Sequence, residues 1–169
     1  MELNSLTAIS PLDGRYFPSV KSLAPYFSEF GLIHYRVRIE VEYFLALTNT
    51  LPELSTFPKI KEGDLKKLFE KFSEADATAI KEIEKTTNHD VKAVEYFLKK
   101  KFDDLNLSAY KEFIHFGLTS QDINNTAIPL SLKEFIDVEF LPAMEALVNH
   151  LSNLSEQWKD IALLARTHG

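Results

Sequence analysis

Three short polar clusters carry residue types that could recognise an anion or move a proton. They are Thr86-Thr87-Asn88-His89-Asp90, Thr119-Ser120-Gln121-Asp122 and Arg166-Thr167-His168-Gly169. Histidine has a reference pKa of about 6.5, so it can give or take a proton near neutral pH. Hydroxyl and amide side chains donate hydrogen bonds to carboxylates and phosphates. The clusters are therefore candidates for acid–base chemistry and for anion binding.

The first two clusters fall where helices are expected to begin, so each also has a purely structural interpretation. Asp90 can cap one helix, and Thr119 with Asp122 provides a hydroxyl cap followed by an acid in the first turn. The pattern alone favours capping. The same positions suit a cradle for phosphate or carboxylate, because the amides of a helix N-terminus attract anions. Both interpretations stay open.

The remaining candidates are an arginine and a histidine near the last residue, and Arg15 with Tyr16. Arg166 and His168 have the ordinary interpretation of surface residues. Arg15 and Tyr16 directly follow Ser10-Pro11-Leu12-Asp13-Gly14, which is a turn signature. An arginine after a tight turn is most often solvated, but its planar guanidinium also suits a bidentate clamp on phosphate.

The elements that would position these residues are helical. The chain has 5 glycines and no Asn-Gly hairpin signal. Residues 36–42 alternate strictly and read alone as a strand, but residues 26–49 lack a breaker and place apolar residues on one helical face. We therefore predict a helix there. Pro129 is expected to kink or break the helix that begins near Thr119.

A heptad-like seam follows between residues 138 and 158, with 3-4 spacing typical of a long bundle helix. Its members are Leu141, Met144, Val148, Leu151, Ser155 and Trp158. Few other segments match its length. The seam is therefore expected to pack on something outside this chain.

Composition narrows the class of protein. The 169 residues carry 25 acidic and 19 basic side chains, a net charge of −6, which argues against a general nucleic-acid binder. Cysteine is absent, which excludes disulfides and thiolate nucleophiles and suggests a reducing compartment. No signal peptide and no membrane span are recognisable, so a soluble cytoplasmic protein is expected. No two histidines have the spacing of a local zinc signature, and neither a metal nor another cofactor is expected.

Four motifs in a fixed order resemble those of the adenylosuccinate lyase family of bacterial type, within the fumarase/aspartase superfamily. Residues 10–16 resemble its N-terminal substrate segment, and residues 85–97, which contain Thr-Asn-His-Asp, resemble its nucleotide-site motif. Residues 112–125 are similar to the first superfamily signature, and residues 164–169, with Arg-Thr-His-Gly, to the start of the second. The resemblance covers nearly the whole chain.

The resemblance implies an all-α fold, with an N-terminal helical domain over residues 1–110 and the beginning of a central helical bundle over residues 111–169. Family members are more than twice as long. Their third signature, a Gly-Ser-Ser-x-Met-Pro-type loop that carries the catalytic serine, does not occur here. The chain is therefore expected to be an N-terminal fragment that is inactive alone.

The resemblance also implies a reaction, the β-elimination of fumarate from adenylosuccinate to give AMP. The family releases fumarate from the succinyl-aminoimidazole-carboxamide ribotide of purine biosynthesis as well. His168 would protonate the leaving nitrogen, and the general base would be the serine of the missing loop. The family enzymes are homotetramers whose active sites combine residues of three subunits.

The substrate-binding roles are implied in the same way. They fall on Arg15 and Tyr16 for the nucleotide phosphate, on Asn88, His89 and Asp90 for the nucleotide, and on Thr119 and Ser120 for a carboxylate. Two alternatives remain: a non-catalytic helical module that binds a partner along the seam, and a superfamily lyase with another succinyl substrate.

Overall fold

Every regular element of the computed structural model, which describes residues 6–164, is a helix. This confirms the predicted all-α class. The α-helices are α1 (Phe17–Val20), α2 (Ala24–Phe27), α3 (Glu29–Thr48), α4 (Glu62–Glu70), α5 (Glu74–Thr87), α6 (Asp90–Asp104), α7 (Ser120–Phe135) and α8 (Leu141–Trp158). Short 3-10 helices are η1 (Lys21–Leu23), η2 (Pro52–Leu54), η3 (Lys59–Lys61) and η4 (Ser108–Phe113), and η5 (Ile136–Phe140) is a π-helix.

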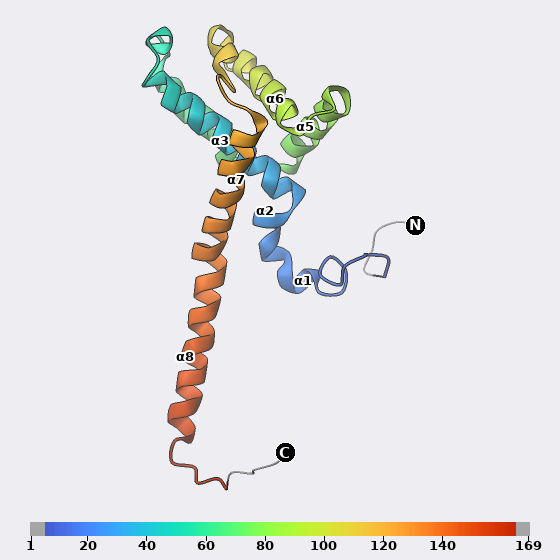
Figure 1. Ribbon diagram of the computed structural model, residues 1–169, viewed down its shortest axis with the longest axis vertical. Coiled ribbons are helices and arrows are strands. Elements are labelled where there is room, and N and C mark those ends of the chain that lie inside the picture. The colour runs from blue at the N-terminus through green and yellow to red at the C-terminus, as the bar shows by residue number, and fades with distance from the viewer. Residues whose placement is uncertain (1–5, 165–169) are drawn as a thin grey trace.

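The helices form a packed head and a projecting arm (Figure 1). We call the helices from α2 to α7 the head, and the stretch formed by η5 and α8 the arm. The arm continues the direction of α7, and the N-terminal segment with α1 leaves the head separately. The candidate loops before α6 and α7 both belong to the head.

Helix α3 is the centre of the head and packs against α2, α4, α6 and α7. Its apolar residues Val37, Val41 and Phe44 are at most 1% exposed, as the helical interpretation predicts. The polar residues Arg36 and Glu40, one turn apart, are buried as well. Helix α3 therefore buries charged as well as apolar residues, within a stretch whose sequence alternates as a strand would.

The helix boundary before α6 differs from the prediction in one residue. Helix α5 ends with Asn88 in the left-handed region at φ 54°, which asparagine tolerates. The N-cap of α6 is His89, whose backbone is extended and whose Nδ1 accepts the Lys92 N–H at 3.2 Å. The expectation that Asp90 caps this helix is therefore wrong, since Asp90 is its first helical residue.

Helix α7 does not break at Pro129, which lies inside it. The proline removes one backbone donor, but buried residues on either side anchor the helix in the head: Ala127, and Ser131, whose hydroxyl donates to the Tyr26 carbonyl at 2.7 Å. The irregularity comes later, in η5, where the Leu141 N–H donates to the Ile136 carbonyl five residues back.

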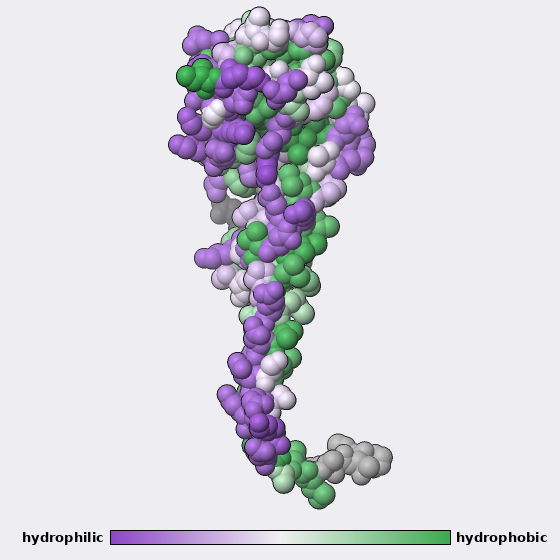
Figure 2. Space-filling model, turned by 90° about the vertical axis from the view of Figure 1, so that its left-hand side faces the viewer, coloured by the Kyte–Doolittle hydropathy of each residue, from purple (hydrophilic) through white to green (hydrophobic). Residues whose placement is uncertain are grey.

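The predicted seam lies along α8, and all of its apolar members are exposed. They are Leu141, Met144, Val148, Leu151 and Trp158. Figure 2 shows hydrophobic side chains along one side of the arm and hydrophilic ones along the other. Among the described residues, no helix combines the length and apolar character that crossing a bilayer requires.

Candidate functional site

Two of the three polar clusters meet at the starts of α6 and α7. His89 Nε2 lies 3.1 Å from the hydroxyl of Ser120, although the residues are 31 positions apart. His89 is the N-cap of α6, and Ser120 is the first residue of α7. Two helix N-termini, both of which favour negative charge, therefore contribute to one surface.

The capping bond fixes the direction of the hydrogen bond between His89 and Ser120. A backbone N–H can only donate, so His89 Nδ1, which receives the Lys92 N–H, carries no proton. The proton of the neutral ring is then on Nε2, and it is donated to the Ser120 oxygen. Ser120 keeps its own hydroxyl proton for an external acceptor such as a carboxylate or phosphate oxygen.

Asp90 forms an ion pair with the buried arginine Arg36. Arg36, with 5% exposure, places Nη2 2.6 Å from Asp90 Oδ2 and donates from Nε to Asn124 Oδ1 at 2.9 Å. The other Asp90 oxygen accepts the Val91 N–H at 2.8 Å. Burial opposes ionisation of Asp90, but the Val91 N–H and Arg36 outweigh burial and lower the pKa of the carboxyl group.

Thr119 forms a reciprocal capping box with Asp122, which confirms the predicted cap. The Thr119 N–H and hydroxyl donate to Asp122 Oδ2 at 2.7 and 2.8 Å, and these bonds lower the pKa of Asp122. The Asp122 N–H is directed back at the Thr119 hydroxyl oxygen. The polar groups of Thr119 are thus engaged within the helix start, whereas the Ser120 hydroxyl faces His89.

The segment that leads into α7 is anchored to α3 by two side chains. His115 Nδ1 pairs with Glu40, and the Tyr43 hydroxyl donates to the Phe116 carbonyl at 2.9 Å. His115 has a φ of 60° and Gly117 a φ of 72°, so the segment turns sharply before Thr119. Burial is the main influence on Glu40 and raises its pKa, although the His115 contacts act in the opposite direction.

The sequence interpretation missed Arg36, Glu40 and His115 as supports of the site. The charged residues of α3 were visible as the alternation in residues 36–42. The i, i+4 spacing of Arg36 and Glu40 was the signal that they share one helical face. Their partners could not be inferred, because these lie 54 to 88 positions further along the chain.

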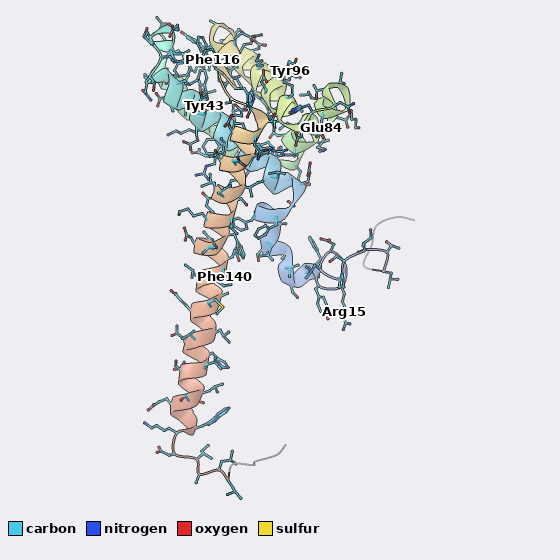
Figure 3. The ribbon with its side chains drawn as sticks, in the orientation of Figure 1. Arg15, Tyr43, Glu84, Tyr96, Phe116 and Phe140 are labelled. Carbon is cyan, nitrogen blue, oxygen red and sulfur yellow. The ribbon has the colours of Figure 1, made fainter. Side chains whose placement is uncertain are left out.

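The structure places two further predicted site residues, Arg15 and Asn88, outside the contact between His89 and Ser120. Arg15 is on the N-terminal segment, away from the head, with its guanidinium 5.5 Å from the centre of the Tyr16 ring (Figure 3). Asn88 is exposed and borders a hollow of about 320 Å³ with Lys81, Glu84 and Lys85. Arg166 and His168 lie outside the described residues.

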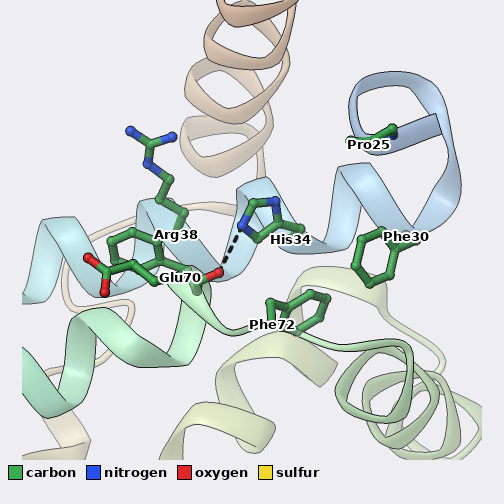
Figure 4. Close-up of a pocket in the computed structure, with 7 residues that line it drawn as sticks. Pro25, Phe30, His34, Arg38, Glu70 and Phe72 are labelled. Atoms are coloured by element: carbon green, nitrogen blue, oxygen red, sulfur yellow. Dashed lines mark hydrogen bonds between the residues drawn. The ribbon is translucent and has the colours of Figure 1, made fainter. Parts of the chain in front are cut away.

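A separate pocket of about 440 Å³ opens on another part of the head (Figure 4). It is lined by Pro25, Phe30, His34, Arg38, Phe69, Glu70 and Phe72, none of which belongs to the polar clusters. His34 Nε2 lies 3.1 Å from the Phe69 carbonyl, and burial lowers the His34 pKa. Among the described residues, no group of three His, Asp or Glu side chains converges to hold a metal ion.

Comparisons with known proteins agree with the motifs. A family model described as lyase matches residues 31–169. The chain is 53% identical to an adenylosuccinate lyase of Dictyostelium discoideum. It is 49% identical to the adenylosuccinate lyases of Vibrio cholerae and Escherichia coli K12. Each alignment covers 100% of this chain but 38% of the relative, so the chain spans less than half the length of these proteins.

Proposed function

This chain belongs to the lyase family, and we propose from this premise that it supplies part of an adenylosuccinate lyase active site. The reaction is the elimination of fumarate from adenylosuccinate, which gives AMP, and from the succinyl-aminoimidazole-carboxamide ribotide. The names of the relatives support this assignment, since their identity with the chain extends over its whole length. Both steps belong to purine biosynthesis, and we propose a cytoplasmic location for them.

The observation that carries the proposal is the pairing of His89 with Ser120. It leaves a serine hydroxyl free to donate, beside two helix N-termini, to a carboxylate or phosphate oxygen of the substrate. We assign the carboxylate to the start of α7, at Thr119 and Ser120, and the nucleotide to the start of α6, at Asn88, His89 and Asp90. Arg15 and Tyr16 are assigned to the phosphate.

In the elimination, a base removes a proton from the Cβ atom of the succinyl group and the C–N bond breaks. The intermediate carries extra negative charge on a carboxylate, and donors that are already oriented stabilise such charge strongly. The leaving nitrogen must gain a proton, and we assign this step to His168. The base is assigned to a serine outside this chain.

Chain geometry supports a site shared between copies in a homotetramer. Ser120 begins α7 and Trp158 ends α8, and the two helices continue in the same direction (Figure 1). At about 1.5 Å per residue, these residues lie on the order of 55 Å apart. His168 follows Trp158 by ten residues, and these span at most about 35 Å. The His168 and Ser120 that act on one substrate would therefore come from different copies.

We propose that residues 1–110 form an N-terminal domain and that residues 111–169 begin the central bundle. Helix α7 would join the two, since it packs on α3 at one end and leads into the arm at the other. Adenylosuccinate, AMP and fumarate are the proposed small-molecule partners.

The test is fumarate release from adenylosuccinate by the protein extended past Gly169 to its natural stop. We expect cleavage, and a severe loss in a His168→Ala variant of the same protein. Argininosuccinate serves as the control substrate, and preference for it would shift the assignment to another superfamily lyase. A folded but inert wild type would favour the non-catalytic module, for which the exposed α8 seam is the specific observation.

A further inference from the structure

Arg36 makes two contacts that tie the candidate loops together from inside the head. Its Nη2 atom lies 2.6 Å from Asp90, the first residue of α6, and its Nε donates at 2.9 Å to Asn124, in the second turn of α7. We propose that Arg36 is a positioning residue that sets the distance between His89 and Ser120. This inference rests on the proposed function for its role in catalysis, but the contacts themselves do not.

The contacts close a ring of interactions. Arg36 binds Asp90, which follows His89 directly in the chain, and His89 donates to Ser120. From Ser120, the first turn of α7 leads to Asn124, which accepts from Arg36 again. Any change in the spacing of α6 and α7 must therefore stretch a contact of Arg36 or the bond between His89 and Ser120.

Arginine suits this position because its guanidinium is planar and presents donors in a fixed fork. A lysine has one ammonium group on a flexible stem and no second donor at the position of Nε. Arg36 is also anchored by its place on α3, where the adjacent Val37 is completely buried. The fork is consequently held by the helix on which α2, α4, α6 and α7 all pack.

The ring changes the role expected for Asp90. One of its oxygens receives Arg36 and the other receives the Val91 N–H. The carboxylate is thereby committed to the protein, and it acts on the site by holding the start of α6. Asp90 is thus a positioning residue as well, whereas Ser120 keeps a hydroxyl proton for a ligand.

The experiment compares Arg36→Met with Arg38→Met in the full-length protein. Arg38 is a matched control on the same helix, because it pairs with Glu134 at 2.7 Å and takes no part in the ring. Hydrogen exchange followed by mass spectrometry reports on residues 86–92 and 119–124. We expect exchange in both segments to accelerate about tenfold in Arg36→Met and to stay at the wild-type rate in Arg38→Met.

Kinetics supply the second readout. When the contacts of Arg36 are lost, substrate and transition state should both bind more weakly. In Arg36→Met, KM should therefore rise by about 10- to 100-fold while kcat falls less. Arg36→Lys should keep the fold and one contact, and should therefore accelerate exchange in one segment only. Wild-type exchange in both segments of Arg36→Lys, or wild-type exchange and KM in Arg36→Met, would overturn the proposal.

A double variant tests whether Asp90 acts through Arg36. If it does, Asp90→Asn should raise KM about as much as Arg36→Met, and the combined variant should be no worse than either. Multiplied effects in the combined variant would mean that Asp90 has a separate role at the substrate, against the proposal. If the wild type is inert, the proposed function fails, and the exchange rates still decide the role of Arg36.

Discussion

His115 Nδ1 lies 2.5 Å from Oε1 of Glu40, a residue with 0% exposure in the middle of α3. The other carboxylate oxygen of Glu40 is buried without a hydrogen-bond partner among the described residues. A buried charged group is stable only when it is paired, so the His115 ring is essential to this arrangement. The contact fixes the segment from which α7 and its serine begin.

Replacing Glu40 with alanine should therefore be costly. We expect Glu40→Ala to lower the free energy of unfolding by about 2–4 kcal/mol, because it leaves His115 without its partner and opens a cavity. Glu42→Ala is the control, since Glu42 is half exposed and should change stability by less than about 0.5 kcal/mol. Urea denaturation measures both, and equal effects would contradict the importance of the buried pair.

The capping box before α7 should make stability depend on pH. The Thr119 bonds lower the pKa of Asp122 below its ordinary 3.8, so the folded state binds fewer protons than the unfolded state at acidic pH. The contribution is thus complete above pH 3.8 and is lost as pH falls through the folded pKa. Thermal melting should show a difference between wild type and Asp122→Ala that shrinks on acidification. A difference that stays constant at every pH would argue against the cap.

Thr119 and Ser120 should separate into different roles. Thr119→Ala removes the cap and should cost about 1 kcal/mol of stability. Ser120→Ala leaves the cap intact, so stability should change by less than about 0.5 kcal/mol. Under the proposed function, its effect should instead appear as a raised KM of the full-length protein, since the free hydroxyl is lost. The reverse pattern in melting and kinetic measurements would assign the substrate contact to Thr119.

The exposed seam of α8 should drive self-association of the 169-residue chain. Contiguous apolar surface of this kind marks an interaction site, and Leu151 lies within it at 56% exposure. Leu151→Lys should lower the average mass in sedimentation experiments. Asn153→Lys, which adds the same charge at a polar position, should not. A monodisperse and highly thermostable wild-type monomer would refute the expectation.

The 169-residue chain alone should release no fumarate from adenylosuccinate. The proposed base is absent from it, and proton abstraction cannot be replaced by binding groups. Absorbance assays at high protein concentration provide the measurement. Steady turnover by the purified chain would place a base among the residues present here.

Local pattern was enough to predict much of the fold. The apolar periodicity identified α3, and the hydroxyl–acid spacing identified the capping box at Thr119. The cap of α6 was misassigned because aspartate is the commoner cap, whereas here His89 accepts the backbone bond and Asp90 turns to Arg36. Pro129 was expected to kink or break α7, and the helix does not break there. Local propensity carries no information about the packing of α7 on α3.

The candidate site was predicted only as separate pieces. Motifs pointed to His89 and Ser120 individually, but no local pattern could indicate that their side chains meet. The supports on α3 were invisible for the same reason, since Arg36 and Glu40 find their partners on helices and loops far along the chain. Such pairings depend on how the helices pack.

The division into head and arm has a consequence for the order of events during synthesis. Helix α3 packs on α7, which leaves the ribosome roughly ninety residues later. The packing of the head can therefore be completed only after the intervening helices α4 to α6 and then α7 have been made. Helix α8 of the arm is made after the head and has its main contacts with η5, the segment just before it. The head can therefore be complete while the apolar side of α8 is still uncovered. Assembly of the proposed homotetramer would then be a late step whose rate depends on concentration.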